Sequence, residues 1–210
     1  MQHSETASES DAGDQIAAPS LPREVALADG TAAELRLMTE IDLPRLAALL
    51  GSVPVDDLLA LRRVSTAPEA LARWAVAVTG GQVTTVLAER KGVVVGEASL
   101  RHHHEPALAH TAEIEVVVAP AARAHGLGAA LVTEIFLLAL ARGVHKIIAP
   151  MTLDAGPAVA LFQTLGFQIE GLLRGQLRDR SGSAHDLVLM GLDVDEFCAR
   201  LTAYGLEDLA

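Results

Sequence analysis

The chain has 210 residues, of which 50% are hydrophobic and 3% are aromatic. This length suits one well-packed core, and this apolar content excludes a chain that is disordered throughout. The net charge of -11, from 16 basic and 27 acidic residues, argues against broad binding to the phosphate backbone of a nucleic acid. The single cysteine, Cys198, excludes an intramolecular disulfide and a thiolate metal cage.

No targeting or membrane segment is predicted. The longest unbroken apolar run has about seven residues, whereas a helix that spans a bilayer needs about 20. The first residues carry no basic segment and no apolar run, so they do not resemble a secretory signal. We therefore expect a cytoplasmic protein without a membrane partner.

Residues 1–22 are expected to form a disordered acidic tail. They include four acidic residues and neither lysine nor arginine, and Ser, Ala and Pro fill much of the rest. Such a stretch buries too little apolar surface to offset the entropy lost on ordering. A single domain is expected over residues 23–210.

Strand and helix patterns alternate from residue 33 onward. Polar and apolar side chains alternate over residues 33–38, which predicts a half-buried strand. Two helix starts follow at 39–44 and 66–69, each with a proline in its first turn, and Gly51 and Gly80 are expected to end these helices. Three strands are then expected in a row, at 83–89, 93–100 and 111–118.

The second half of the chain predicts a crossover helix and a closing hairpin. The expected elements are a helix from 127 to 142, a strand at 146–149, a helix from 154 to 165, strands at 167–178 and 185–192, and a helix from 193 toward 205. Asp154 is expected to cap the second of these helices. Hairpins and a crossover occur together, so the sheet must be mixed.

One segment carries chemistry. A strand ends near Val118, a loop turns, and a helix opens at Gly126 and Gly128. Glycine lets the backbone approach a ligand, and the first turn of a helix offers unpaired N–H groups and a dipole that favours an anion. These features predict a phosphate cradle. A Walker loop needs Lys-Ser or Lys-Thr after the glycines, and a dinucleotide fingerprint needs its first glycine directly after the strand; neither is present.

The cradle sequence R-x-x-G-x-G at 123–128 resembles the motif [QR]-x-x-G-x-[GA] of the GNAT superfamily, the Gcn5-related N-acetyltransferases. The preceding V-x-P-x-x-R at 118–123 and the downstream AVALFQTLGF at 158–167 are also similar to that family. The resemblance covers about residues 32–194. It implies an α/β GNAT fold, with a mixed, mostly antiparallel sheet of about six to seven strands, flanking helices and splayed central strands.

The same resemblance implies acetyl-CoA as the cosubstrate and no metal. Main-chain groups of the strand would pair with the pantetheine arm, and backbone amides of the loop would hold the pyrophosphate. The implied cofactor-binding residues are Val116, Val117, Val118, Arg123, Ala124, His125, Gly126, Leu127, Gly128, Ala129 and Phe162. The acceptor would be a primary amine of a small molecule, an amino acid or a peptide. A homodimer is common in the family, and the sequence leaves it open here.

The resemblance is less complete for the catalytic side chains. An ammonium must lose a proton before it can attack, so a base is required. Glu113 and Glu115 lie two residues apart and share a face of the strand that enters the motif. Many family members use a carboxylate on this strand, and we expect Glu115, which is nearer the splay, ahead of Glu113. Phe162 stands where the family usually has a tyrosine that protonates the leaving thiolate, and phenylalanine has no proton to donate.

Three functions therefore stay open. The first is an acetyl-CoA-dependent N-acetyltransferase, and the second is a GNAT-fold sensor or interaction module that binds acyl-CoA without turnover. The third is a nucleotide-binding domain. The run from His102 to His104, with Glu105 and His110 nearby, has no recognised metal-ligand spacing, and we expect it to form a solvated loop.

Overall fold

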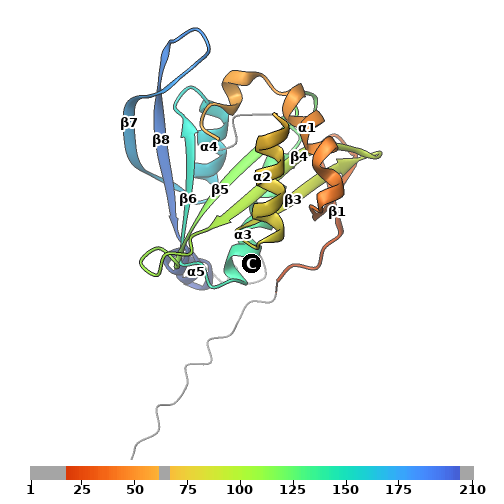
Figure 1. The fold of residues 1–210 in the computed structure, drawn as a ribbon. Helices are drawn as coiled ribbons and strands as arrows, with labels where there is room; N and C mark the ends of the chain where they lie inside the picture. Colours follow the sequence, from red (N-terminus) through yellow and green to blue (C-terminus); the bar gives the residue numbers. More distant parts are fainter. Residues whose placement is uncertain (1–17, 62–66, 204–210) are drawn as a thin grey trace, which may run out of the picture.

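The computed structural model describes residues 18–61 and 67–203 (Figure 1). Most of the expected acidic tail, residues 1–17, lies outside the described residues. So do Thr66, at the expected start of the second helix, and Gly205, at the expected end of the last one. None of the helices in the described part of the chain has the length and the apolar run that a bilayer crossing requires.

An eight-stranded sheet, in the order β1-β2-β3-β4-β5-β6-β8-β7, organises the described residues. Its strands are β1 Arg23–Ala26, β2 Ala32–Leu37, β3 Val83–Arg90, β4 Val93–His102, β5 Thr111–Val118, β6 Lys146–Thr152, β7 Gln168–Arg178 and β8 Ala184–Asp193. Within these strands β5 and β6 pair in parallel, and every other pairing is antiparallel. The mixed, mostly antiparallel sheet is thus confirmed, with one strand more than expected, because the sequence analysis did not predict β1.

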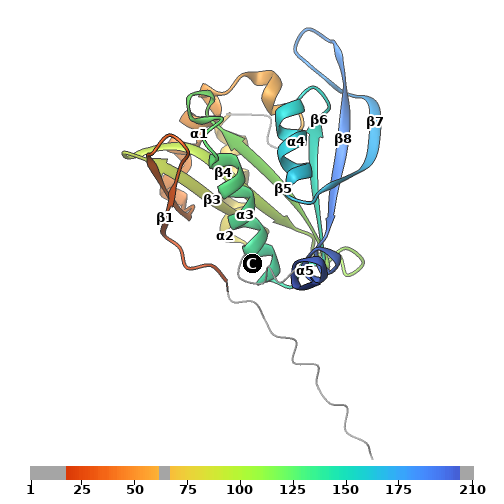
Figure 2. The same cartoon turned by 180° about the vertical axis from the view of Figure 1, so that it is seen from behind.

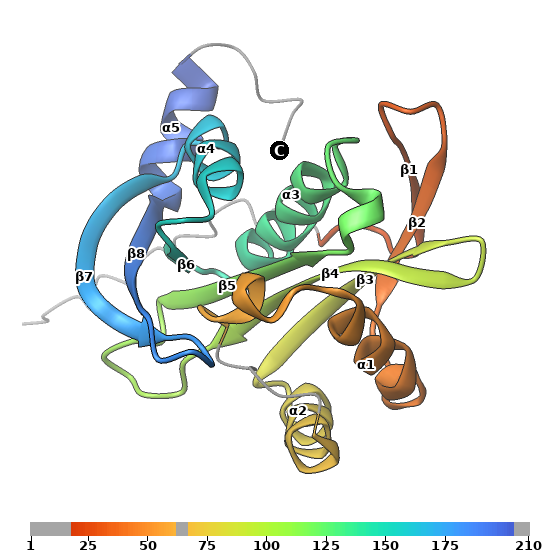
Figure 3. The same ribbon diagram turned by 90° about the horizontal axis from the view of Figure 1, so that it is seen from above.

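Helices cover both faces of this sheet (Figures 2 and 3). They are the 3-10 helices η1 Glu40–Asp42, η2 Val55–Leu58 and η3 Pro120–Ala122, and the α-helices α1 Leu43–Ser52, α2 Pro68–Thr79, α3 Leu127–Leu140, α4 Gly156–Thr164 and α5 Val194–Ala203. On one face, Leu46 and Trp74 from α1 and α2 pack with Leu87 of β3. On the other face, Leu131 and Ile135 of α3 belong to the larger core cluster. The sheet is therefore the middle layer of three.

The two parallel strands diverge along their length. Their ladder has three residue pairs and ends at Glu113 and Ile148, although β5 continues to Val118 and β6 continues to Thr152. Beyond Glu113, β5 pairs only with β4 among the described strands. This divergence is the splay that the family resemblance implied, and it opens toward the end of the sheet where α3 begins.

Two expected helix ends are wrong. Helix α1 continues through Gly51 and ends at Ser52. Helix α4 has Ala155 as its N-cap residue and no capping side-chain bond, so Asp154 does not cap it. The Asp154 carboxylate instead lies 2.8 Å from Nδ1 of His185, on β8. An ion pair with another strand has replaced the local cap.

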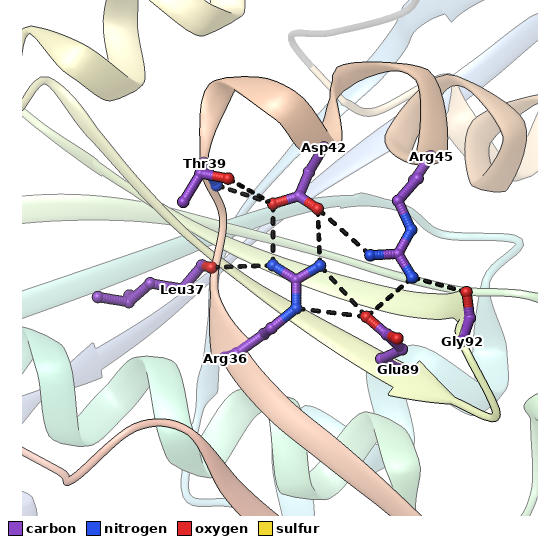
Figure 4. A network of polar contacts seen from close by, with 7 residues as sticks. All are labelled: Arg36, Leu37, Thr39, Asp42, Arg45, Glu89 and Gly92. Atoms are coloured by element: carbon purple, nitrogen blue, oxygen red, sulfur yellow. Dashed lines mark hydrogen bonds and ion pairs between the residues drawn. The ribbon is translucent and has the colours of Figure 1, made fainter.

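A polar network attaches α1 to the sheet (Figure 4). Arg36 of β2 donates to both carboxylate oxygens of Asp42, at 2.6 and 2.8 Å, and Asp42 accepts the N–H of Thr39 in the predicted capping box. Glu89 of β3 pairs with Arg36 at 3.2 Å and with Arg45 of α1 at 2.9 Å. The hydrogen bonds from Arg36, together with the Thr39 contacts, hold the pKa of Asp42 well below its usual range. The network joins β2, β3 and the start of α1.

Replacing Asp42 by asparagine is expected to lower the free energy of unfolding by about 1 to 3 kcal/mol, because it leaves the half-buried Arg36 cation without its main partner. The lowered pKa of Asp42 sets the sign of the pH effect. The carboxylate stabilises the fold fully above its unfolded pKa of about 4, and this stabilisation is lost as the pH falls through the lower folded value. Urea unfolding of both proteins between pH 3 and pH 7 measures this difference, which should shrink in acid. Asp29→Asn, at the longer 3.4 Å pair with Arg90, in which neither side chain is buried, is the matched control and should change stability less.

Candidate functional site

The segment predicted to form a phosphate cradle lies at the start of α3. Gly126 is the N-cap residue and adopts a left-handed conformation with φ of 87°, and Ala124 is also left-handed. The first bond of the helix runs from the N–H of Ala130 to the carbonyl of Gly126. The N–H groups of residues 127–129 precede that bond, so the helix does not use them. They leave a helix end that favours an anion, beside an exposed loop.

Two glycines set how closely α3 approaches its neighbours. A Cβ on Gly128 would lie 3.3 Å from Cδ2 of Leu161 in α4, which is tighter than an ordinary contact. A Cβ on Gly96 of β4 would lie 2.9 Å from Cδ1 of Leu131, which requires something to move. The backbone of α3 can therefore lie close to β4 and to α4. This close packing fixes the start of the helix against the end of the splay.

Arg123 braces the cradle loop. Its Nε donates to the carbonyl of Val118 at 3.0 Å, and its Nη2 lies 2.8 Å from the carboxylate of Asp57 in η2. The N–H of Ala28, in the β1–β2 turn, donates to the carbonyl of His125 at 3.0 Å. The loop is thus tied to the end of β5 on one side and to the β1–β2 hairpin on the other. The side chain of Arg123 positions the backbone that the sequence predicted as the phosphate-binding element.

The strand segment Val116, Val117 and Val118 follows the point where β5 leaves β6. Val117 is buried and packs with the core beneath α1 and α2, whereas Val116 and Val118 are half-buried and lie against the larger core cluster. Because β4 occupies only one edge of this segment, the main-chain groups on its other edge face the splay. An extended ligand arm could pair with that edge in the way an added strand does.

Both predicted carboxylates are buried on the face covered by α1 and α2. Glu113 is 7% exposed and Glu115 is 5% exposed. They share this face with Val117, which belongs to the core cluster of α1 and α2. Their position is therefore not the solvated surface of a sheet.

A third carboxylate, Glu97 of β4, lies on the same face and was missed. It is fully buried, and it accepts a hydrogen bond from Oγ of Ser99 at 2.7 Å. The register places Ser99 directly opposite Glu115, and Oγ of Ser99 lies 3.0 Å from Oγ1 of Thr85 on β3. A buried polar row thus leads across three strands to Glu115. A signal for it is present in the sequence, since Glu97 and Ser99 interrupt the mostly apolar stretch 93–100 of β4 at alternate positions.

Phe162 packs in the core of the α3 face. It is 5% exposed, and its ring meets that of Phe167 edge to face, with centroids 4.9 Å apart. Its ring offers the reaction no proton. The only tyrosine of the chain, Tyr204, lies outside the described residues.

The histidine run differs from the expected solvated loop at its first residue. His102 ends β4 and is half-buried, and its Nε2 lies 2.6 Å from Nη1 of Arg142. Burial and the charge of Arg142 lower the pKa of His102 to about 4, so its ring is neutral at pH 7. No group of three or more potential ligand side chains that could hold a metal ion occurs among residues 18–61 and 67–203.

Comparison with known proteins gives consistent matches. The model of the acetyltransferase (GNAT) family matches residues 55–167. YwnH of Bacillus subtilis strain 168, which is named provisionally as a phosphinothricin acetyltransferase, is 26% identical over 161 residues, or 76% of this chain and 98% of YwnH.

Solved structures of acetyltransferases are also similar to this chain. A ribosomal-protein-alanine N-acetyltransferase from Brucella melitensis is 30% identical, with a TM-score of 0.68, and the match covers 76% of this chain and 98% of that one. A GNAT superfamily phosphinothricin acetyltransferase from Sinorhizobium meliloti, solved in complex with AcCoA, is 26% identical, with a TM-score of 0.66, and the match covers 76% and 87% of the two chains.

Proposed function

The chain belongs to the acetyltransferase (GNAT) family, and we propose that it transfers the acetyl group of acetyl-CoA to a primary amine of a small molecule, an amino acid or a peptide. The observation that carries this proposal is the combination of features on strand β5. This strand ends at the anion-binding start of α3, has one edge open to the splay, and carries two buried carboxylates. β5 and the loop that follows it thus bring together a helix end that favours phosphate, an open main-chain edge for an extended arm and a carboxylate that can act as a base.

Main-chain groups and side chains have different roles in the proposed reaction. Backbone N–H groups at 127–129 hold the pyrophosphate, and main-chain groups at 116–118 orient the pantetheine arm, so that the acetyl thioester lies in the splay. Glu115 accepts a proton from the acceptor ammonium, and the neutral amine attacks the thioester carbonyl directly. The new C–N bond replaces the C–S bond. The attacking nitrogen gives up its second proton to water, and water returns a proton to the departing thiolate, because Phe162 has none to give.

A second candidate function is acyl-CoA binding without turnover, as in a sensor or interaction module. The buried phenylalanine at position 162 favours it, since the family's usual proton donor is absent there. Release of free thiol from acetyl-CoA, measured over a panel of primary amines, separates the two functions. Amine-dependent release supports the transferase. Binding of acetyl-CoA with no thiol release in the presence of any amine of the panel supports the sensor.

We also propose a homodimer that forms through β7. This strand lies at the edge of the described sheet, and Ile169, Leu172 and Leu173 are each more than 40% exposed. An exposed apolar edge strand pairs readily with another strand. Light scattering after size exclusion should give twice the chain mass for the wild type and the mass of one chain for Leu172→Lys. Val93→Lys, at an exposed apolar position in β4, should remain dimeric. A monomeric wild type would contradict the proposal.

A further inference from the structure

The turn of the β7–β8 hairpin is tied to the turn between β6 and α4 by one imidazole. Nδ1 of His185 lies 2.8 Å from a carboxylate oxygen of Asp154, and its Nε2 lies 3.1 Å from a carboxylate oxygen of Asp179. A neutral imidazole has one N–H and can donate to only one of these carboxylates. Two carboxylates at hydrogen-bond distance from opposite ring nitrogens therefore fit the imidazolium. The contact joins three separate segments of the chain.

This contact lies where regular strand pairing stops. The β6–β8 ladder ends at Thr152 and Leu187, and beyond it the N–H of Leu153 donates to the carbonyl of Asp186 at 3.0 Å. The hairpin continues past the end of β6, beside the start of α4 (Figures 1 and 2). Beyond this backbone bond the ladder no longer fixes the hairpin, and the His185–Asp154 contact is the side-chain tie between the two turns.

The position of the hairpin matters for the open end of the splay. β6 and the turn that follows it form one wall of the splay, and the end of β5 forms the other. The hairpin curls toward the face covered by α1 and α2 (Figure 3). Glu113 and Glu115 are buried on that face. The acetyl-CoA cradle, in contrast, is at the start of α3, on the opposite face. The hairpin thus borders the side from which an acceptor would reach the carboxylates.

We propose that His185 is a positioning residue of the acceptor side, which latches the β7–β8 hairpin to the β6–α4 turn and so fixes the position of the hairpin on that side. The assignment of this side of the sheet to the acceptor rests on the proposed function. Hydrogen bonds within its own turn orient the Asp179 carboxylate, because its other oxygen accepts from Oγ of Ser181 and from the N–H of Ser183. The turn therefore presents one carboxylate oxygen to the imidazole.

The latch is expected to loosen as the pH rises. Asp154 and then Asp179 raise the pKa of His185 through their hydrogen bonds. Two charged residues near His185 in the hairpin make hydrogen bonds with main-chain groups: Asp186 accepts from the N–H of Gly175, and Arg178 donates to the carbonyl of Gly182. A group with a raised pKa contributes its full stabilisation below its unfolded pKa of about 6.5, and this contribution is lost as the pH rises through the folded value.

Hydrogen exchange of residues 178–186, corrected for the intrinsic rate at each pH, tests the latch in the full chain. In the wild type, protection should fall by about two- to fivefold between pH 5.5 and pH 8.5, which is the range expected for ion pairs that are partly exposed. His185→Gln should have low protection at both values. His185→Lys, which keeps a cation there, should have high protection at both. His145→Gln, at a comparable pair with Asp195 at the other end of β6, should behave like the wild type.

Equal protection at the two pH values in the wild type, or wild-type protection in His185→Gln, would overturn the latch. Acetyl-CoA affinity, measured by calorimetry, should be the same in all four proteins, because the cradle is on the other face. A loss of more than about threefold in His185→Gln alone would overturn the placement on the acceptor side. If no protein binds acetyl-CoA while the exchange follows the expected pattern, the proposed function fails and the latch remains.

Discussion

Replacing Gly126 by glutamate is expected to abolish the stabilisation of this protein by acetyl-CoA. At a concentration of acetyl-CoA about 100 times its Kd, binding should raise the wild-type stability by about 2.7 kcal/mol, or roughly 5 to 10 °C in Tm for a domain of this size. The glutamate places a carboxylate at the N-cap of α3, beside the N–H groups that would hold the pyrophosphate. Repulsion between this carboxylate and the phosphates should remove the shift, as measured by thermal unfolding with and without the ligand.

A matched control separates this effect from backbone strain. Gly126 has a φ of 87°, where a side chain is strained, so the variant should unfold at a lower temperature even without ligand. Gly81 has a φ of 72°, a Cβ there would meet nothing within 4 Å, and it follows α2 rather than the cradle. Gly81→Glu should therefore lose similar stability but keep the full acetyl-CoA shift. A full shift in Gly126→Glu would show that the pyrophosphate is held elsewhere.

The strands that form the site could be predicted because their sequences carry strong local signals. The expected bounds of β5, residues 111–118, are those observed, and alternation and turn residues placed β3 and β4 within two residues. β1 could not be predicted, because its four residues REVA have no distinctive alternation and form a strand only by pairing with β2. The splay itself came only from the family resemblance. Nothing in the sequences of β5 and β6 tells where their ladder ends.

The site was predicted less completely than the strand that carries it. Glu113 and Glu115 were found because they lie next to the cradle motif in the sequence. Glu97 was missed because it is distant in sequence, and only the β4–β5 register brings it to the same face. The prediction for Asp154 failed in the opposite way: its local sequence predicted a helix cap, but its carboxylate contacts His185 on another strand. Local patterns therefore predicted the elements, whereas tertiary pairing decided which polar groups meet.

Replacing Glu115 by glutamine is expected to lower kcat by about 100-fold or more, which is the usual contribution of a positioned general base. The substitution preserves the shape of the side chain and removes its ability to accept a proton. The acetyl-CoA shift in Tm should be unchanged, because the side chain of Glu115 faces away from the cluster that packs around α3. The rate should be measured by thiol release, with an amine that the panel identifies as an acceptor.

The pH dependence of the rate and two matched variants distinguish Glu115 from the other buried carboxylates as the base. Without the base, only acceptor molecules that are already neutral can react, so the rate of Glu115→Gln should rise about tenfold per pH unit below the pKa of the amine. Glu113→Gln, on the same strand and face, should lower kcat by less than about tenfold and keep the wild-type profile. Glu97→Gln tests the polar row through Ser99, and it should also have a smaller effect, because Glu97 is fully buried. If Glu113→Gln shows the larger loss and the altered profile, the base is Glu113, and the carboxylate nearer the splay only supports it.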